Sequence, residues 1–368
     1  MAKVISLFNH KGGVSKTTTT FNLGWTFAEL GFKVLIVDMD PQCNLTSYVL
    51  GLQSIEDFSS FYDSKQNGDI YSSILPIIEG ERVEPKAITT AKTGHENLFL
   101  VAGHISMAEL DVALSVGLAG SRFLKFSEQF IGAVNATIRE TARKEKYDLV
   151  LIDMSPSASA LNRCILMGSD YFVIPTSPDF FCYQAIQSLS KMIPQWDMDF
   201  KSFRDSSIKN SLPENKPQLL GILSQRYNLY TKKDGKEAAS SFQYWIDKIQ
   251  NASFEILAQG LKKSDMIINE EIFRKYVTEE QPYNLISIPN FNSLIAKSQE
   301  YNKPIFRLTQ QELGYTGKVL DQQMDNQKKF LGLFMRLASI ISSLIGLPIA
   351  DKEKFDTLIK RASEPLQS

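Results

Sequence analysis

The sequence is poor in the side chains that stabilise small secreted domains and bind structural metals. It has three cysteines, Cys43, Cys164 and Cys182, and no two of them lie close enough in sequence to form a C-x-x-C pair. A disulfide framework or a structural zinc site is therefore not expected. The three histidines show no ligand spacing either. These absences predict a protein of the reducing cytoplasm.

Long apolar runs and an excess of one charge are also missing. No run of about twenty apolar residues occurs, so no membrane-spanning helix is expected, and the chain opens into the apolar run KVISLF (3–8) without a secretory signal. Forty basic residues meet 41 acidic ones, for a net charge of −1. This balance argues against a surface that is positive throughout but leaves a local basic patch open. A hydrophobic content of 43% excludes disorder of the whole chain.

Short apolar runs alternate with helical patterns. Runs such as VLIVD are apolar on both faces, which is typical of strands buried in a parallel sheet. Residues 17–30 carry a helical pattern between the first two runs, and Gly31 supplies a stop. Strand, helix and strand within 38 residues make a βαβ unit, so we predict an α/β fold with a mostly parallel twisted sheet flanked by helices. The runs are VISLF (4–8), VLIVD (34–38), LFLVA (98–102), DLVLID (148–153), YFVIP (171–175), LLGIL (219–223) and NLISIP (284–289).

We expect one domain over residues 1–368 with two interruptions of this rhythm. Residues 195–217 are polar and rich in turn formers, which favours an excursion over the surface. Residues 228–283 contain helical patterns, such as SFQYWIDKIQNASFEILAQGL (241–261), and are expected to form a helical insertion.

The stretch NHKGGVSKTTTT (9–20) joins the first apolar run to the first helix. It ends like the phosphate-binding loop G-x-x-x-x-G-K-[ST], but His10 and Ser15 occupy the two glycine positions. A glycine-rich turn between a strand and a helix directs unpaired N–H groups and the helix dipole at one point. The context therefore predicts an anion site, to which Lys16 adds a cation and Thr17 a hydroxyl group for magnesium.

Three stretches resemble, in order, the ParA/MinD family of deviant-Walker P-loop ATPases. They are KGGVSKTTTTFNLG (11–24), VLIVDMDPQCN (34–44) and YDLVLIDMSPS (147–157), and ISIPN…NKPIF (286–306) continues the resemblance. In that family the first glycine position is free to vary, so only Ser15 departs from the loop pattern. The resemblance is to ParA/Soj-like members without an N-terminal helix-turn-helix, and it implies that the chain binds ATP or ADP with Mg²⁺.

The resemblance also implies roles for the loop. Lys11 matches the signature lysine, which reaches across a dimer interface to the partner's nucleotide, and Lys16 matches the lysine that holds the β- and γ-phosphates. Thr17 matches the magnesium ligand, and Asp153 the Walker B acid that holds magnesium through water. The residues expected to cradle the nucleotide are Lys11, Gly12, Gly13, Val14, Ser15, Lys16, Thr17 and Thr18, together with Asp38.

Asp38 and Asp40 match the two acids of the family's D-x-D-P-Q motif. Asp40 is the expected water-orienting residue, and with Lys11 and Lys16 it completes the implied catalytic set. Phosphoryl transfer depends on positioning and charge neutralisation, which lysines, a metal and a carboxylate supply. Ser155 replaces the first proline of D-x-P-P-S, and this change, like the serine in the loop, bears on turnover more than on binding.

Relatives switch between a monomer and an ATP-dependent sandwich dimer that binds DNA in ParA proteins or membrane in MinD proteins. A membrane partner requires an exposed amphipathic helix; residues 330–347 have too thin a polar face and are expected to pack on the sheet. Nonspecific DNA remains open as a partner, although IPNFNSLIAKSQ (288–299) contains only Lys297 as a basic residue. The candidate DNA-contacting residues are Lys232, Lys233, Lys236, Lys262, Lys263, Arg274 and Lys275.

We therefore expect a slow, partner-stimulated ATPase that forms a homodimer with ATP and responds to a ParB-like adaptor. Its role would be DNA or plasmid partition, or the positioning of another cargo, in the cytoplasm with nucleoid association left open. The alternatives are a MinD-like membrane-associated positioning ATPase and a nucleotide-binding module with little turnover. An iron–sulfur carrier built on the same loop would need paired cysteines, which the sequence lacks.

Overall fold

The computed structural model describes residues 1–64, 66–120, 127–227, 229–232, 235–238, 240–277, 281–349 and 352–363. Its centre is an eight-stranded sheet in the order β10-β7-β6-β1-β5-β2-β4-β3, in which every neighbouring pair is parallel except β3 and β4. The predicted α/β class with a mostly parallel sheet is confirmed. The strands are β1 (Lys3–Leu7), β2 (Val34–Met39), β3 (Ala91–Lys92), β4 (Leu98–Val101), β5 (Leu149–Met154), β6 (Tyr171–Thr176), β7 (Gln218–Tyr227) and β10 (Asn284–Pro289).

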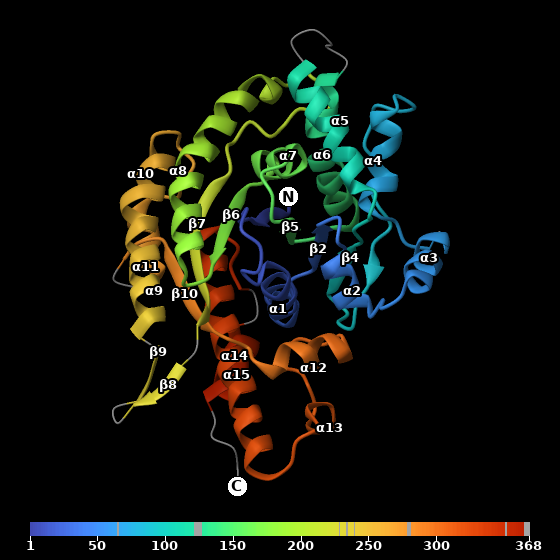
Figure 1. Ribbon diagram of the computed structural model, residues 1–368. Helices are drawn as coiled ribbons and strands as arrows, with labels where there is room; N and C mark the ends of the chain where they lie inside the picture. Colours follow the sequence, from blue (N-terminus) through green and yellow to red (C-terminus); the bar gives the residue numbers. More distant parts are fainter. Residues whose placement is uncertain are drawn as a thin grey trace.

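Helices cover both faces of this sheet (Figure 1). The helices are α1 (Lys16–Glu29), α2 (Asn44–Leu50), α3 (Ile55–Asp63), α4 (Ile70–Ile78), α5 (Met107–Gly120), α6 (Glu128–Glu145), α7 (Ala160–Gly168), α8 (Phe180–Phe200), α9 (Ser240–Ala252), α10 (Gln259–Lys262), α11 (Glu270–Tyr276), α12 (Ser293–Tyr301), α13 (Gln310–Leu313), α14 (Gly317–Leu344) and α15 (Lys352–Ser363).

The strands are apolar on both faces because each face has its own core. Along β1, Val4 belongs to the core under α4–α8, and Ile5 belongs to the core under α1 and α14. The same alternation divides Val150 from Leu151 in β5. Strands buried on both sides in this way read as continuous hydrophobic runs, which explains why the sequence revealed them.

Helix α1 is more deeply buried than its apolar pattern suggests. Every residue of the helix except Thr17 is buried, polar ones included. The outer side is covered by α14 and by the chain after β10, and the polar groups find partners there. The side-chain oxygen of Asn22 accepts a hydrogen bond from the backbone N–H of Ile305 at 3.0 Å, and Glu29 pairs with Arg307 at 2.6 Å.

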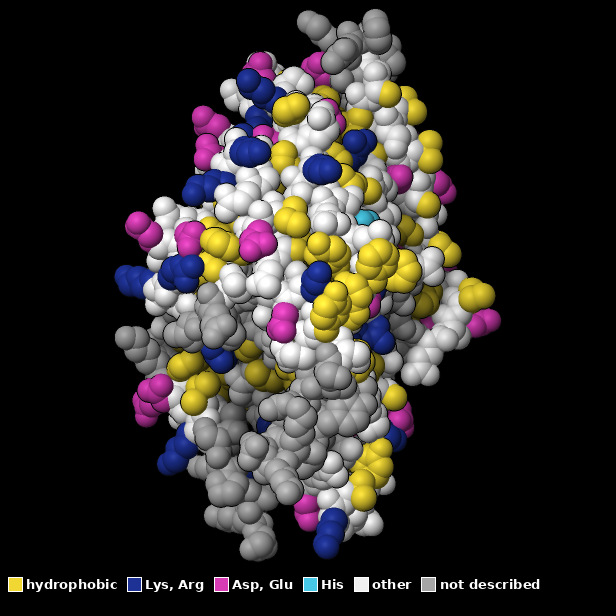
Figure 2. Space-filling view, turned by 60° about the vertical axis from the view of Figure 1, so that its left-hand side comes forward, with side chains coloured by type: hydrophobic (Ala, Val, Ile, Leu, Met, Phe, Trp, Pro, Cys, Tyr) yellow, Lys and Arg dark blue, Asp and Glu magenta, His cyan; other side chains and the backbone are white. Residues whose placement is uncertain are grey.

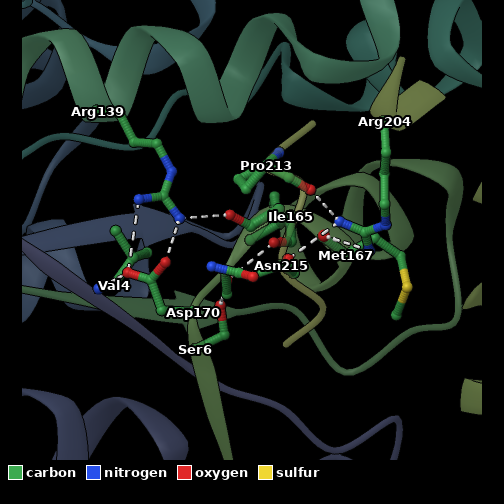
Figure 3. Close-up of polar contacts among 11 residues, drawn as sticks. Val4, Ser6, Arg139, Ile165, Met167, Asp170, Arg204, Pro213 and Asn215 are labelled. Carbon is green, nitrogen blue, oxygen red and sulfur yellow. Dashed lines mark hydrogen bonds and ion pairs between the residues drawn. The ribbon is translucent and has the colours of Figure 1, made fainter. Parts of the chain in front are cut away.

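The amino-terminal edge of the sheet is closed by structural polar contacts (Figure 3). Asp170, just before β6, accepts a hydrogen bond from the backbone N–H of Val4 at 2.8 Å and pairs with Arg139 of α6 at 2.8 Å. Nearby, Ser6 and Ser169 share a hydrogen bond of 2.6 Å, and the Arg204 guanidinium donates to the carbonyl oxygen of Met167 at 3.1 Å. These contacts tie β1, β6 and α6 together at the amino ends of the strands.

The two interruptions contain regular structure as well as loops. Residues 195–200 are the last part of α8, and a 3-10 helix (Lys201–Arg204) follows them. Residues 228–283 contain the antiparallel hairpin β8 (Leu229–Lys232) and β9 (Gly235–Ala238), then α9, a π-helical segment (Ser253–Ala258), α10 and α11. The division into one domain with an insertion remains a prediction.

The apolar part of α14 packs into the molecule, as the sequence predicts for residues 330–347. Phe330, Phe334 and Ile341 are buried in the core that also contains Phe21 of α1. Among the residues that the structure describes, no helix is both long enough and apolar enough to span a bilayer.

Candidate functional site

The loop between β1 and α1 lies at the carboxyl edge of the sheet, where open α/β sheets place their ligands. Gly13 and Ser15 both adopt left-handed backbone conformations, with φ of 73° and 60°. For a residue with a side chain this conformation costs about 1–2 kcal/mol. Ser15, which departs from the family pattern, therefore imposes strain on the loop, and this strain forms part of its wrapped shape.

The Lys16 side chain is held inside the loop. It is 7% exposed, and its Nζ donates to the carbonyl oxygens of Asn9 at 3.1 Å and Lys11 at 3.3 Å. Burial lowers the pKa of Lys16, while Asp153 and Asp40 oppose that shift. The loop itself is anchored by Asn9, whose side chain donates to the carbonyl oxygen of Pro175 at 2.8 Å and accepts from the N–H of Lys11 at 2.9 Å. The cation is thus placed before any ligand arrives.

Asp38 is locked in place at the end of β2. Its carboxylate accepts hydrogen bonds from the backbone N–H of Thr46 at 2.8 Å and from the Thr46 hydroxyl at 2.7 Å, and the backbone N–H of Asp40 donates to it at 3.1 Å. Burial is the main cause that raises the pKa of Asp38, to about 6. The same Thr46 hydroxyl accepts from the N–H of Gly103 at 2.9 Å, so this acid ties β2 to the chain after β4.

Asp40 points to the open space at the same edge. It is 8% exposed and lines the main cavity. One of its carboxylate oxygens accepts a hydrogen bond from the N–H of Gln42 at 3.0 Å, which fixes the carboxylate at the start of the turn into α2. The remaining oxygen can accept a hydrogen bond from a water molecule in the cavity.

Asp153 lies one residue before the end of β5 and is paired in register with Asp38. It is 1% exposed, and within the described part of the chain no hydrogen bond of good geometry reaches its carboxylate oxygens. Burial and the neighbouring Asp38 raise its pKa, while Thr17 and Lys16 oppose that shift. An unpartnered buried carboxylate is costly unless a cation or a donor satisfies it, and oxygen ligands of this kind suit magnesium.

These side chains surround a cavity of about 720 Å³. Its floor is the phosphate loop, from Gly13 to Thr18. One wall comes from Asp40 and α2, and another from the ends of β7 and β10 and from α12. Among the described residues, those lining it are Gly13, Val14, Ser15, Lys16, Thr17, Thr18, Asp40, Asn44, Ser47, Tyr48, Gln53, Met154, Pro156, Arg226, Asn290, Ile295, Ala296, Gln299 and Glu300.

The predicted site residues divide into four groups around this cavity. The loop from Gly13 to Thr18 and Asp40 line it, whereas Gly12 is exposed and does not. Asp38 and Asp153 lie buried behind the lining, at the ends of their strands. Lys11 is turned away and forms an ion pair with Asp179, the residue that caps the start of α8.

The sequence pattern missed two charged residues at this edge, Asp179 and Arg226. Each residue follows a predicted strand, and the carboxyl ends of parallel strands meet at one edge of the sheet. Their positions could therefore have predicted that they lie near the phosphate loop, although no sequence motif contains them. The Arg226 guanidinium donates to the carbonyl oxygen of Gly13 and lines the cavity. Asn290 lines it too, just after β10.

The three cysteines, Cys43, Cys164 and Cys182, are all free and buried. Over the residues described above, no group of three or more His, Cys, Asp and Glu side chains is placed to hold a metal ion.

A parallel sheet with a phosphate loop between its first strand and first helix defines a P-loop nucleotide-binding protein. The family model described as "AAA domain" matches residues 2–203, more than half of the chain. The chain belongs to this family and, within it, to the ParA/MinD type of P-loop ATPase.

Two curated relatives support this assignment. The chain is 30% identical over 189 residues to the sporulation initiation inhibitor protein Soj of Bacillus subtilis, a match that covers 51% of this chain and 64% of the relative. It is 32% identical over 186 residues to the chromosome-partitioning ATPase Soj of Thermus thermophilus, which covers 50% and 59%. The match therefore spans less than two thirds of either relative.

Solved structures share the fold. A protein of Corynebacterium diphtheriae superposes with a TM-score of 0.60 at 21% identity, over 82% of this chain and 97% of that one. At this identity the similarity shows the architecture alone.

Proposed function

We propose that this chain is a ParA-like ATPase that hydrolyses ATP to ADP and phosphate and uses the cycle as a dimeric switch in DNA partition or cargo positioning. The proposal includes the slow, partner-stimulated turnover, the ParB-like adaptor and the cytoplasmic location expected from the sequence. One observation carries it: the buried Lys16, a wrapped phosphate loop and the Asp40 carboxylate converge on one cavity. The name of the Thermus thermophilus relative, a chromosome-partitioning ATPase, supports the reaction and the role.

The residues divide the work of phosphoryl transfer. Backbone N–H groups of the loop and the N-terminus of α1 bind the phosphate oxygens, and Lys16 neutralises negative charge on the β- and γ-phosphates. Asp40 holds the attacking water in line through the carboxylate oxygen that does not accept from Gln42. Charges that are already positioned lower the cost of reorganisation when negative charge develops on the phosphate oxygens.

The residues at the base of the cavity suit a magnesium ion. Thr17 would contribute its hydroxyl oxygen, and Asp153 would hold the ion through water with its buried carboxylate, whose pKa Thr17 already affects. When bound, magnesium neutralises charge on the phosphates. Asp38 remains apart from this role because its oxygens already accept hydrogen bonds from Thr46 and Asp40.

A nucleotide-binding module with little turnover is the second candidate. Two observations favour it: the strained backbone of Ser15, and the pairing of Lys11 with Asp179, which keeps that lysine out of the cavity. A module of this kind would bind ATP in the same cavity and would not release phosphate when DNA or a partner is added. The MinD-like alternative loses its candidate membrane helix because the apolar face of α14 is buried.

DNA is the proposed surface for the switch. Lys262, Lys263, Arg274 and Lys275 lie on or next to α10 and α11, whereas Lys233 lies outside the described residues. On the face that carries α8–α11, basic and acidic side chains are interspersed and hydrophobic ones gather near the middle (Figure 2). Arg274 is paired with Glu270 at 2.8 Å. Any DNA contact would therefore rely on a few lysines, so its affinity would fall with salt with a correspondingly shallow slope.

Phosphate release separates these functions. We expect the wild type to release phosphate slowly with Mg-ATP and faster with DNA and a partner, and Lys16→Ala to release none. Binding of ATP without release under any condition would favour the static module. Binding of neither ATP nor ADP would contradict the site itself.

A further inference from the structure

The end of β7 places a second cation beside the phosphate loop. Among the described residues that line the cavity, Lys16 and Arg226 are the basic ones, against Asp40 and Glu300. Glu300 is already paired with Lys297 at 3.0 Å. A nucleotide polyphosphate brings several negative charges into this space, and Lys16 alone balances only part of them.

Arg226 is held in an uncommon backbone conformation between two anchored neighbours. Its φ is 62°, in the left-handed region. Before it, Gln225 is buried and its side-chain amide donates to the hydroxyl of Thr19 in α1 at 2.7 Å. After it, the carbonyl oxygen of Tyr227 accepts from the N–H of Asn290 at 2.9 Å. A glycine would adopt this conformation without strain. Strained residues of this kind cluster at functional sites, so the arginine side chain is a candidate for a functional role.

The same arginine touches the loop that binds the phosphates. Its Nη1 donates to the carbonyl oxygen of Gly13, and a Cβ atom placed on Gly13 would lie 3.2 Å from that nitrogen. The guanidinium is exposed, and a guanidinium has five N–H donors in a fork that matches phosphate oxygens. One donor can stay on the loop while the others face the cavity.

We propose that Arg226 is a nucleotide-binding residue that takes the phosphate tail of the nucleotide with its guanidinium while it braces the loop at Gly13. This inference rests on the proposed function, because it requires a nucleotide in the cavity. It adds to the nucleotide site a residue of β7 that lies outside the phosphate-loop motif.

The test compares ATP and ADP affinities of three variants by competition against a fluorescent ATP analogue. We expect Arg226→Gln to bind ATP about tenfold more weakly than wild type, because a charge-assisted hydrogen bond is lost, and Arg226→Lys to retain most of the affinity. Arg143→Gln, at an exposed arginine of α6 that does not line the cavity, is the matched control and should bind as wild type does. Unchanged ATP affinity in Arg226→Gln would overturn the proposal.

Arg226→Gly separates binding from folding. Glycine removes the left-handed strain, so the nucleotide-free variant should have a higher Tm than wild type and still bind ATP more weakly. A higher Tm with unchanged ATP affinity would overturn the proposal. Loss of binding in Lys16→Ala with full binding in Arg226→Gln would overturn this inference and leave the proposed function standing, whereas a wild type that does not bind ATP would overturn both.

Discussion

Lys11 and Asp179 form an ion pair that joins the phosphate loop to the first turn of α8. Asp179 also caps that helix, since its carboxylate accepts a hydrogen bond from the N–H of Cys182 at 2.9 Å. Both side chains of the pair are partly exposed, so the pair contributes at most about 1 kcal/mol. If Lys11 reaches a partner's nucleotide, as the family resemblance implies, it has to leave Asp179 first.

Release of Lys11 should favour the dimer. In Asp179→Asn the amide oxygen still caps α8, because asparagine is a good N-cap, but the charge that holds Lys11 is gone. Each dimer releases two such pairs, so we expect the ATP-dependent dimer to form at up to about thirtyfold lower protein concentration, as measured by sedimentation. Asp69→Asn, at the cap of α4, is the matched control. An unchanged dimer midpoint in Asp179→Asn would show that the pair does not restrain the switch.

Asp40 should affect turnover and spare binding. Its carboxylate lines the cavity and accepts a hydrogen bond from Gln42, and the proposed function leaves the phosphate contacts to the loop and Lys16. We expect Asp40→Ala to bind ATP within about twofold of wild type and to release phosphate about a hundredfold more slowly. Asp63→Ala, an exposed acid of α3, is the control. Normal turnover in Asp40→Ala would assign the water-orienting role to another group.

Ser15 should limit stability. A glycine adopts φ of 60° without the steric cost that serine bears, so Ser15→Gly should raise the free energy of unfolding by about 1 kcal/mol and the Tm by about 2 °C. Ser54→Gly, at a serine with φ of −131° that caps α3, should give no such gain. If Ser15→Gly is less stable than wild type, the serine side chain contributes a stabilising contact that outweighs its strain.

Asp38 should make stability depend on pH. Its pKa is raised from 3.8 to about 6 in the folded chain, so between these values the folded state keeps a proton that the unfolded state has lost. The corresponding stability is fully present below about pH 4 and is lost as the pH rises through 6, by about 3 kcal/mol.

The asparagine variant tests that titration. Relative to wild type, Asp38→Asn should gain about 3 kcal/mol of stability between about pH 4 and pH 7, measured by urea unfolding. The pKa of Asp57 is lowered by a hydrogen bond from the backbone N–H of Gln53. Asp57→Asn is therefore expected to lose stability relative to wild type as the pH rises, which is the opposite sign. A difference between Asp38→Asn and wild type that stays constant with pH would contradict the assignment.

The strands were predictable from the sequence where both of their faces are buried. All seven predicted runs are strands because both faces of the sheet are covered, so each strand is apolar throughout. Strand β3 (Ala91–Lys92) was not predicted, because a strand of two residues at the antiparallel edge of the sheet is too short to show a hydrophobic pattern. The polar residues buried in α1 were also invisible, because their partners, such as Ile305 and Arg307, lie far along the chain.

The candidate site was predictable where its residues are contiguous. The loop and the acids after β2 and β5 stand in local motifs, so sequence alone could assign them. Arg226 and Asp179 reach the same edge only because β6 lies beside β1 and β7 lies beside β6. The strain at Ser15 and the Lys11–Asp179 pair follow from backbone conformation and from tertiary contact, which a linear pattern does not contain.

The most direct test of the account is the molar mass of the purified chain in ADP and in ATP, measured by light scattering, with Lys11→Ala as the control. The account predicts the mass of a single 41.5-kDa chain with ADP, twice that mass with ATP, and a single chain for Lys11→Ala in both nucleotides. A wild type that keeps the mass of one chain with ATP, while binding ATP, would contradict the dimeric switch.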